Sequence, residues 1–399
     1  MQDRSASAPL LILILAGLAM IGPFSVDTYL PSFPAIGRTF SVTALELQQT
    51  LSAYLVAFAV MTLFHGTLSD SFGRRPIILG CLVIYTLASI GCATAQSFGQ
   101  LLLFRGAQGI AGGAGWVIGR AIVRDVFEGH RAQRVLSMVT MIFGLAPALA
   151  PLVGGALQEA FGWRSVFAFL VAYGAIMLAV VWRALPETHP PAARQPFAFA
   201  PLARNYLKLG GHPLMVLLCL AAAFNFCGLF LYIASAPAII YDLLGLTERH
   251  FPALFVPTVG GIMLGALLSG RLAGRISASR MVAIGYAIMF CAAGFSAAFH
   301  AFNPPSLAWS VPPVACYAVG MTLSAPNIQL LVLDLFPRNR GLASSLQGFV
   351  HTLFSAIAAG VISPYVTGSA ATLAAAGLAL PAMGLVCWIA YRGLAARAR

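Results

Sequence analysis

One acidic residue lies deep inside an apolar stretch near the start of the sequence. Asp27 is the single charge between residues 9 and 37, in a run that reads LLILILAGLAMIGPFSVDTYLPSFPAIG from residue 10. An ionisable side chain at membrane depth is costly, so it faces protein or a water-filled cavity and marks an ion or substrate path. We therefore predict that Asp27 lies on such a path. The alternative is a helix-packing acid that a neighbouring group satisfies.

The other reactive residue types are scattered. The seven cysteines all fall in apolar runs and no CxxC pair occurs, so we expect small core residues and neither a disulfide framework nor a metal site. No GxxxxGK[ST] loop is present, which argues against direct coupling to ATP. A membrane enzyme needs clustered catalytic groups near one interface, and none are clustered. We therefore predict no enzyme activity and no cofactor.

The composition fixes the class of protein. Hydrophobic residues make up 60% of the 399 residues and charged residues 9%, whereas a soluble domain has about 25% charged residues. The chain is therefore expected to be a polytopic membrane protein in contact with lipid. Its net charge of +12 comes without a basic cluster that alternates with aromatics, so we expect no nucleic-acid partner and interpret the excess as a topology signal.

Apolar runs between charged or Pro/Gly breaks predict twelve transmembrane helices. The expected spans are 9–37, 47–69, 76–95, 99–121, 134–157, 164–185, 213–241, 251–270, 280–299, 307–331, 342–363 and 370–391. The longest polar connection is rich in proline and bases, and it predicts three parts: an N-terminal six-helix bundle (1–186), a cytoplasmic linker (187–212) and a C-terminal six-helix bundle (213–399).

Loop charges predict the orientation. With both termini in the cytoplasm, nineteen of the 23 Lys and Arg residues fall on the cytoplasmic side and three fall outside. That bias is the positive-inside signal of membrane proteins.

Two loops of the halves are related. GTLSDSFGRRP (66–76) follows the second span, and GRLAGR (270–275) ends the eighth; a shift of 201 positions places Gly73 on Gly274 and Arg74 on Arg275. Coincidence among basic, small-residue loops is the alternative. Duplication predicts an all-α membrane protein with two pseudo-symmetric six-helix bundles, in which a central site forms between the halves.

The motif G-x-L-x-D-x-x-G-R-R between spans two and three resembles the loop motif of the major facilitator superfamily. SVDTYLPSFP (25–34), LLLFRGAQGIAGG (101–113), RDVF (124–127) and LAPALAPLVGG (145–155) are similar to its Bcr/CflA drug-resistance branch. That branch includes exporters of bicyclomycin- and chloramphenicol-type drugs. The resemblance covers the whole chain and is sharpest in the first half.

The resemblance implies a conformational latch at the cytoplasmic end of the first half. Glycines there permit a tight turn, Asp70 can cap the following segment, and the arginines can reach an acid on span four. In the family, the corresponding acid closes such a charge cluster, and we interpret it as a latch that holds the outward-open state and breaks when the inner side opens. The alternative is plain topology, with bases at a cytoplasmic turn. The predicted latch comprises Gly66, Asp70, Gly73, Arg74, Arg75 and Asp125.

Arg105, in span four, corresponds to a family arginine that faces the central cavity near the first helix. A buried arginine in lipid needs an acid or several carbonyls. Burial favours the protonated form of Asp27, whereas a cation nearby favours the ionised form. With these effects balanced, Asp27 would bind and release a proton as the cavity changes its exposure to water. The alternative for Arg105 is a structural helix clamp.

Span five carries the counterpart of the family's antiporter motif. Its prolines break or bend the helix and its glycines allow close packing. The motif residues are Pro147, Pro151, Gly154 and Gly155, and Ala150 before Pro151 matches the drug-exporter branch.

Polar and aromatic side chains of the spans are candidates for a drug pocket. The alternative for each is core, lipid or interhelical packing. His351 can also titrate near neutrality, and it is a second candidate for proton transfer. The expected substrate-binding residues are Tyr29, Tyr54, Phe58, Trp116, Phe143, Asn225, Phe230 and His351.

Together these features predict a proton-coupled multidrug efflux antiporter of the bacterial inner membrane, a monomer that exports small, fairly apolar compounds by alternating access. A proton-coupled exporter of a physiological metabolite or sugar would share every motif, and a sensor without transport would show no flux.

Overall fold

The computed structural model describes residues 8–337 and 339–397, and the side chains of all of these except Ala8, Gly129 and His130. Within these ranges the chain is helical, with no strand beyond an isolated bridge between Ala273 and Ile276. Twelve helical segments of the described residues are long and apolar enough to span a membrane. This confirms the predicted all-α membrane fold with twelve spans.

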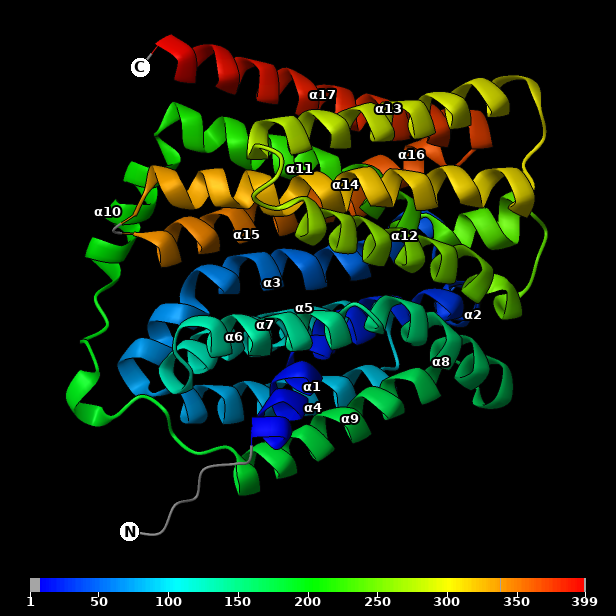
Figure 1. Cartoon of the computed structure of the whole chain (residues 1–399). Helices are drawn as coiled ribbons and strands as arrows, with labels where there is room; N and C mark the ends of the chain where they lie inside the picture. The colour runs from blue at the N-terminus through cyan, green and yellow to red at the C-terminus, as the bar shows by residue number, and fades with distance from the viewer. Residues whose placement is uncertain (1–7, 338, 398–399) are drawn as a thin grey trace. The chain divides into compact units, whose positions relative to one another are not determined.

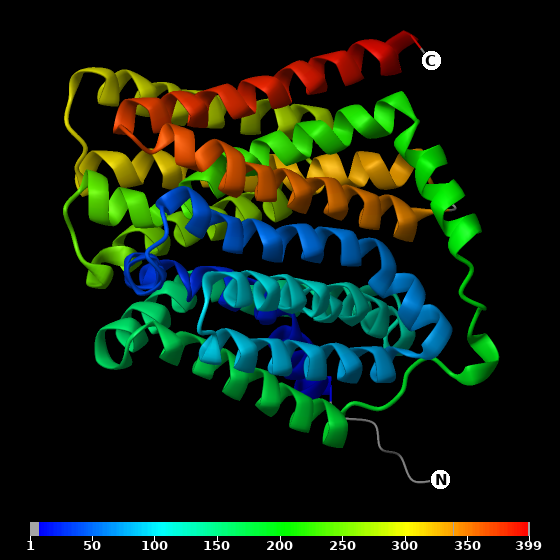
Figure 2. The same cartoon turned by 180° about the vertical axis from the view of Figure 1, so that it is seen from behind.

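The chain divides into two compact units, Met1–Phe199 and Ala200–Arg399, and each holds six of the candidate spans. Figure 1 and Figure 2 show the helices of both units in chain order. The helices of the first unit are α1 (Ala8–Asp27), α2 (Phe33–Phe40), α3 (Ala44–Phe72), α4 (Arg74–Thr94), α5 (Phe98–Gly112), α6 (Ala114–Val126), α7 (Gly129–Phe143), α8 (Ala146–Phe161) and α9 (Trp163–Ala184).

The second unit begins with a helix that lies outside the spans. Its helices are α10 (Phe199–Gly210), α11 (Pro213–Ala234), α12 (Phe251–Leu272), α13 (Ala278–Phe302), α14 (Leu307–Leu335), α15 (Arg340–Ile357), α16 (Ser363–Val366) and α17 (Ala370–Arg397). Short 3₁₀ or π turns lie between helices in both units: η1 (Leu30–Ser32) and η2 (Pro191–Ala193) in the first, and η3 (Ala238–Leu243), η4 (Glu248–His250) and η5 (Ala358–Ile362) in the second.

Three spans of the first unit are interrupted where the sequence predicts continuous or merely bent helices. α1 ends at Asp27 because Pro31 has no N–H to donate to the carbonyl of that residue. Span four breaks at Gly113 between α5 and α6. Span five breaks between α7 and α8, just before Pro147, so the predicted proline break occurs about two and a half turns before the glycines of the motif.

The seventh span is shorter than expected. It was predicted to reach residue 241, but α11 ends at Ala234 and the chain continues into the π turn η3. Pro237 lies between them and cannot donate the hydrogen bond that would continue the helix.

Glycines allow the helices of each unit to approach closely. α3 lies beside α5 and α4 beside α9, and in the second unit α14 lies beside α12 and α13 (Figures 1 and 2). A Cβ on Gly115 would lie 2.7 Å from the carbonyl carbon of Leu18, and one on Gly285 would lie 2.6 Å from the carbonyl oxygen of Gly320. Such contacts are how helices pack in lipid, where no hydrophobic force drives them together.

The two loops that the sequence relates each have a glycine with positive φ at the matched position. Gly73 has φ 101° and Gly274 has φ 78°, both in the region that side chains disfavour. Gly73 follows α3, and Gly274 lies two residues after the end of α12. The shared positive φ at matched positions supports the internal repeat.

Candidate functional site

Asp27 is the last residue of α1, at the break in the first span. Its side chain is buried, with 4% of the residue exposed. Among the described residues, no group donates a hydrogen bond to the carboxylate or forms an ion pair with it. The negative end of the α1 dipole also opposes a charge at this position. This geometry differs from that of a packing acid satisfied by a neighbour.

Arg105 is fully buried in α5 and does not pair with an acid. Its Nη1 donates to the carbonyl of Ser25 at 3.1 Å and to Oε1 of Gln108 at 2.9 Å. The guanidinium lies over two rings, 4.7 Å from the centroid of Tyr29 and 4.6 Å from that of Tyr54. Arg105, the expected charge partner of Asp27, thus packs between two aromatic rings and is bonded to α1 through a backbone carbonyl.

The sequence did not single out the polar residues that surround Arg105. Gln108 donates through Nε2 to Ser89 Oγ at 2.8 Å, and the hydroxyls of Ser25 and Tyr85 lie 2.7 Å apart. These contacts link α1, α4 and α5 through a buried network. The signal in the sequence is the spacing of Arg105 and Gln108, three residues apart on one helix face in an apolar span.

The two tyrosines that the sequence assigned to substrate binding are fully buried around Arg105. The hydroxyl of Tyr29 forms a hydrogen bond with that of Thr50. The hydroxyl of Tyr54 occupies the space that a Cβ on Gly112 would fill. In this arrangement both side chains hold Arg105 in place.

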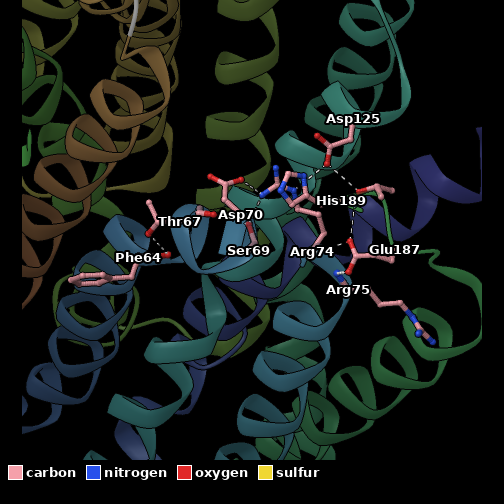
Figure 3. Close-up of polar contacts among 11 residues, drawn as sticks. Phe64, Thr67, Ser69, Asp70, Arg74, Arg75, Asp125, Glu187 and His189 are labelled. Carbon is pink, nitrogen blue, oxygen red and sulfur yellow. Dashed lines mark hydrogen bonds and ion pairs between the residues drawn. The ribbon is translucent and has the colours of Figure 1, made fainter. Parts of the chain in front are cut away.

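Arg74 joins two acids at the end of the unit where α3 and α4 meet (Figure 3). It forms an ion pair with Asp70, and its Nε donates to Asp125 Oδ2 at 3.1 Å. Nη1 also donates to Ser69 Oγ at 2.7 Å. The structure therefore brings the predicted latch acids together on one arginine. Asp70 pairs with Arg74 and does not cap α4, whose N-cap Gly73 receives no side-chain hydrogen bond.

A residue of the connection after α9 completes this cluster, which the sequence did not predict. Glu187 accepts the backbone N–H of Arg74 at 3.0 Å and that of Arg75 at 3.3 Å (Figure 3). The first N–H groups of a helix lack intrahelical acceptors, so Glu187 supplies the missing cap of α4. Thr188 donates to Asp125 at 3.1 Å, while the Arg75 side chain donates to the carbonyl of Trp182 at 2.6 Å and reaches no acid.

The two glycines of the latch have different roles. Gly73 needs its positive φ, and a Cβ there would lie 2.5 Å from Oε2 of Glu187 and 2.7 Å from Nη2 of Arg194. Gly66 lies about two turns earlier in α3, where an added Cβ would lie 3.8 Å from Val117, an ordinary contact distance. Gly73 is therefore required by both the turn and the carboxylate that packs against it.

α8 contacts the chain directly after Asp27. A Cβ on Gly154 would lie 2.7 Å from the carbonyl carbon of Thr28, so only glycine permits this approach. Gly155 and Pro151 are also buried, and Pro147 lies in the first turn of α8. The predicted antiporter motif thus packs against the break in the first span.

Three further predicted aromatic residues lie elsewhere in the first unit. Trp116 stacks on Phe143 at 4.6 Å between ring centroids, and the Arg120 guanidinium lies 4.0 Å from the centroid of the same indole. Phe58 lies against Gly113, where a Cβ would approach its ring to 3.2 Å. Arg120 is thus another arginine of the first unit that lies against an aromatic ring.

In the second unit, Phe230 and His351 are joined by a residue that the sequence did not single out. Phe226 stacks on Phe230 at 5.7 Å and contacts the His351 ring at 4.0 Å. Asn225 is buried against α17, where its Oδ1 lies 2.5 Å from the position of a Cβ on Gly384. Among the described residues, no His, Cys, Asp and Glu side chains gather in a way that could hold a metal ion.

Comparison with known proteins gives one family. The family model described as Major Facilitator Superfamily matches residues 14–359. The chain is 30% identical to the bicyclomycin resistance protein homolog of Haemophilus influenzae, over 93% of each chain. It is 27% identical to multidrug resistance protein D of Escherichia coli, over 95% of each chain.

A solved structure supports the fold. The crystal structure of a bacterial homolog of the human lysosomal transporter Spinster, inward-facing and unoccupied, superposes with a TM-score of 0.74 at 19% identity. The match covers 98% of this chain and 97% of the other. At that level of identity the likeness concerns the fold alone.

Proposed function

Because the chain belongs to the major facilitator superfamily, we propose that it is a drug/proton antiporter of the bacterial inner membrane. In this proposal both termini lie in the cytoplasm, and the protein exports small, fairly apolar compounds of the chloramphenicol or bicyclomycin type. Full-length similarity to proteins named for bicyclomycin and multidrug resistance supports the drug substrates. The excess of bases in the predicted cytoplasmic loops supports the orientation.

Asp27 carries the proton in this mechanism. The observation behind this role is a buried carboxylate at a broken helix end that receives no hydrogen bond or ion pair from the described residues. Such a group is free to bind a proton or a substrate donor in turn, whereas a paired carboxylate is occupied. The break also exposes backbone groups at mid-span, which transporters tolerate where a cavity or protein satisfies them.

Arg105 positions the last turn of α1. Its bond to the carbonyl of Ser25 holds the backbone two residues before Asp27, and the two tyrosine rings fix the guanidinium. A positive charge at this depth favours neutral or anionic substrates over strongly cationic ones. Gly154 of α8 holds the residue after Asp27, so both sides of the carboxylate are fixed by close contacts.

The transport cycle follows from competition at this site. Deprotonated Asp27 accepts a substrate from the cytoplasm, outward opening releases it, and protonation of Asp27 permits the return. Substrate and proton then weaken each other's binding by the same factor. The membrane potential contributes about 2.3 kcal/mol per 100 mV to the free energy that drives each charge across the membrane.

The latch contacts of the first unit belong to one state of this cycle. In the proposal, Arg74 bound to Asp70 and Asp125, with Glu187 capping α4, stabilises the outward-open state. Opening of the cytoplasmic side requires these contacts to break. The Arg74 side chain is 7% exposed, whereas those of Asp70 and Asp125 are 49% and 21% exposed. Opening of the cytoplasmic side therefore returns a mostly buried guanidinium to water as its ion pairs break.

Everted membrane vesicles that carry the protein test the function. Respiration acidifies the lumen and quenches a fluorescent amine, and we expect chloramphenicol or bicyclomycin to restore fluorescence as protons leave in exchange. Xylose and similar sugars are predicted to have no effect. Recovery with sugars and not with the drugs would favour a metabolite or sugar exporter, and no recovery with any compound would contradict antiport.

A further inference from the structure

A cavity lies within the second unit, between α11, α13, α14 and α17. Its empty space, counted out to its open side, is about 700 Å³. None of the residues assigned above to proton coupling, substrate binding or the latch lines it. Its lining runs along α13 from Ala292 to His300, which is about 12 Å of helix.

Small side chains on facing helices create this space. Ala292 and Ala293 of α13 and Ala374 and Gly377 of α17 line the cavity with small side chains. A Cβ on Gly377 would meet no atom within 4 Å. Because these side chains are small, the space between the helices is not filled.

One end of the cavity is polar. His300 Nδ1 donates to the carbonyl of Ser296 at 2.8 Å, and its Nε2 lies 2.9 Å from Ser310 Oγ. Tyr232 also lines the cavity, and its hydroxyl has no hydrogen-bond partner among the described residues, although only 9% of the residue is exposed. The cavity thus holds an unused donor beside a histidine–serine pair.

The polar end coincides with a belt of exposed aromatic rings. Phe299 stacks on Trp309 at 5.3 Å, Trp309 is 51% exposed and Phe302 is 88% exposed. They lie at the end of α13 and the start of α14, where His300 and Ser310 also lie. Trp rings gather at the level of the lipid headgroups, and Trp309 next to Ser310 therefore indicates that the mouth of the cavity lies at a membrane interface.

We propose that this cavity binds one alkyl chain of an amphiphile that enters from the adjoining leaflet. The chain lies along Ala292, Ala293 and Gly377, and its ester or hydroxyl group accepts a hydrogen bond from Tyr232 near His300 and Ser310. A membrane phospholipid and a free single-chain amphiphile share this chemistry. The site is separate from Asp27 and does not depend on the proposed antiport.

Photolabelling of the full-length protein in phosphatidylethanolamine–phosphatidylglycerol vesicles tests the site. One arm contains a phosphatidylethanolamine with a diazirine at the end of one acyl chain, and the other arm contains diazirine-bearing decanol. We expect adducts in peptides that cover 228–232, 292–300 and 370–377, above those on exposed residues such as Ile389 and Leu394. Labelling by the lipid or by the alcohol alone identifies which source occupies the site.

A cavity-filling variant makes the test specific. Gly377→Leu places a side chain in the empty space, and it should lower labelling of these peptides at least fivefold. The matched control is Gly294→Leu, on α13, where an added Cβ also meets nothing within 4 Å but which does not line the cavity. If Gly377→Leu does not yield monodisperse protein, Ala374→Leu replaces it. No enrichment in either arm, or equal labelling of filled and control variants, overturns the proposal.

Discussion

Removal of the Glu187 carboxylate should release the first turn of α4. Glu187 accepts two backbone N–H groups that have no acceptor within the helix, those of Arg74 at 3.0 Å and Arg75 at 3.3 Å. A hydrogen bond to a charged group contributes about 1.5–3 kcal/mol. The second bond is long and the side chain is 25% exposed, so we take about 2 kcal/mol for both bonds, equal to about 30-fold in an opening equilibrium.

Hydrogen exchange measured by mass spectrometry reads this opening directly. In Glu187→Ala, the amides of peptides that cover 70–80 should exchange about 30-fold faster than in the wild type. Peptides in the middle of α9 should not change, because the substituted residue lies outside that helix.

Glu128→Ala is the matched control. Glu128 also precedes a helix, as the N-cap of α7, but its side chain makes no capping hydrogen bond. Its substitution should therefore leave exchange at the start of α7 within about twofold, since only the weak dipole interaction is lost. Equal effects of the two substitutions, or a change below threefold in Glu187→Ala, would refute the assignment of Glu187 as the cap of α4.

Three further outcomes are expected. Gly154→Ala should lower the melting temperature in detergent, because the added Cβ would lie 2.7 Å from a backbone carbon of Thr28 and overpacking costs about 1–3 kcal/mol. The control Gly106→Ala, where a Cβ meets nothing within 4 Å, should leave the melting temperature unchanged. Arg105→Lys keeps the charge but loses the planar stacking on two tyrosine rings, so it should also melt earlier, by about 1–2 kcal/mol; an unchanged melting temperature would mean that the rings contribute nothing. Burial raises the pKa of the Asp242 carboxyl, so folding disfavours its ionised form and stability falls as the pH rises through the unfolded and then the folded pKa. Asp242→Asn should therefore raise the melting temperature at pH 7 and not at pH 3, and a gain at both values would contradict this cause.

The twelve spans could be predicted because the bilayer sets a length that every span must meet. The break in span five was predicted from its prolines, whereas the breaks in spans one and four were not, since a window of mean hydropathy does not register one missing hydrogen bond. Pro31 contains the signal for the end of α1 at Asp27, and Pro147 contains that for the start of α8. Proline alone does not locate a break, because Pro23 and Pro151 lie inside α1 and α8.

The cluster around Arg74 was partly predictable for a similar reason. Asp70 and Arg74 are four residues apart, and Asp125 ends an apolar span at the same side of the unit. Glu187 was missed because its approach depends on how the segment after α9 turns back, which no local pattern encodes.

Arg105 is held without the acid that the sequence led us to expect. A buried arginine was expected to need an acid or several carbonyls, and Asp27 was the predicted acid. The structure satisfies the guanidinium with one carbonyl, one amide and two aromatic faces. Aromatic residues on neighbouring helices are therefore alternative partners for an intramembrane arginine.

Proton release on drug binding tests the central claim most directly. Chloramphenicol is added to the detergent-purified protein in weakly buffered solution, and the pH change is followed for the wild type, Asp27→Asn and the surface control Glu128→Gln. The account predicts release from the wild type and the control, and binding without release from Asp27→Asn. Release from Asp27→Asn equal to that of the wild type would contradict proton carriage by Asp27, and His351 would then be the next group to substitute.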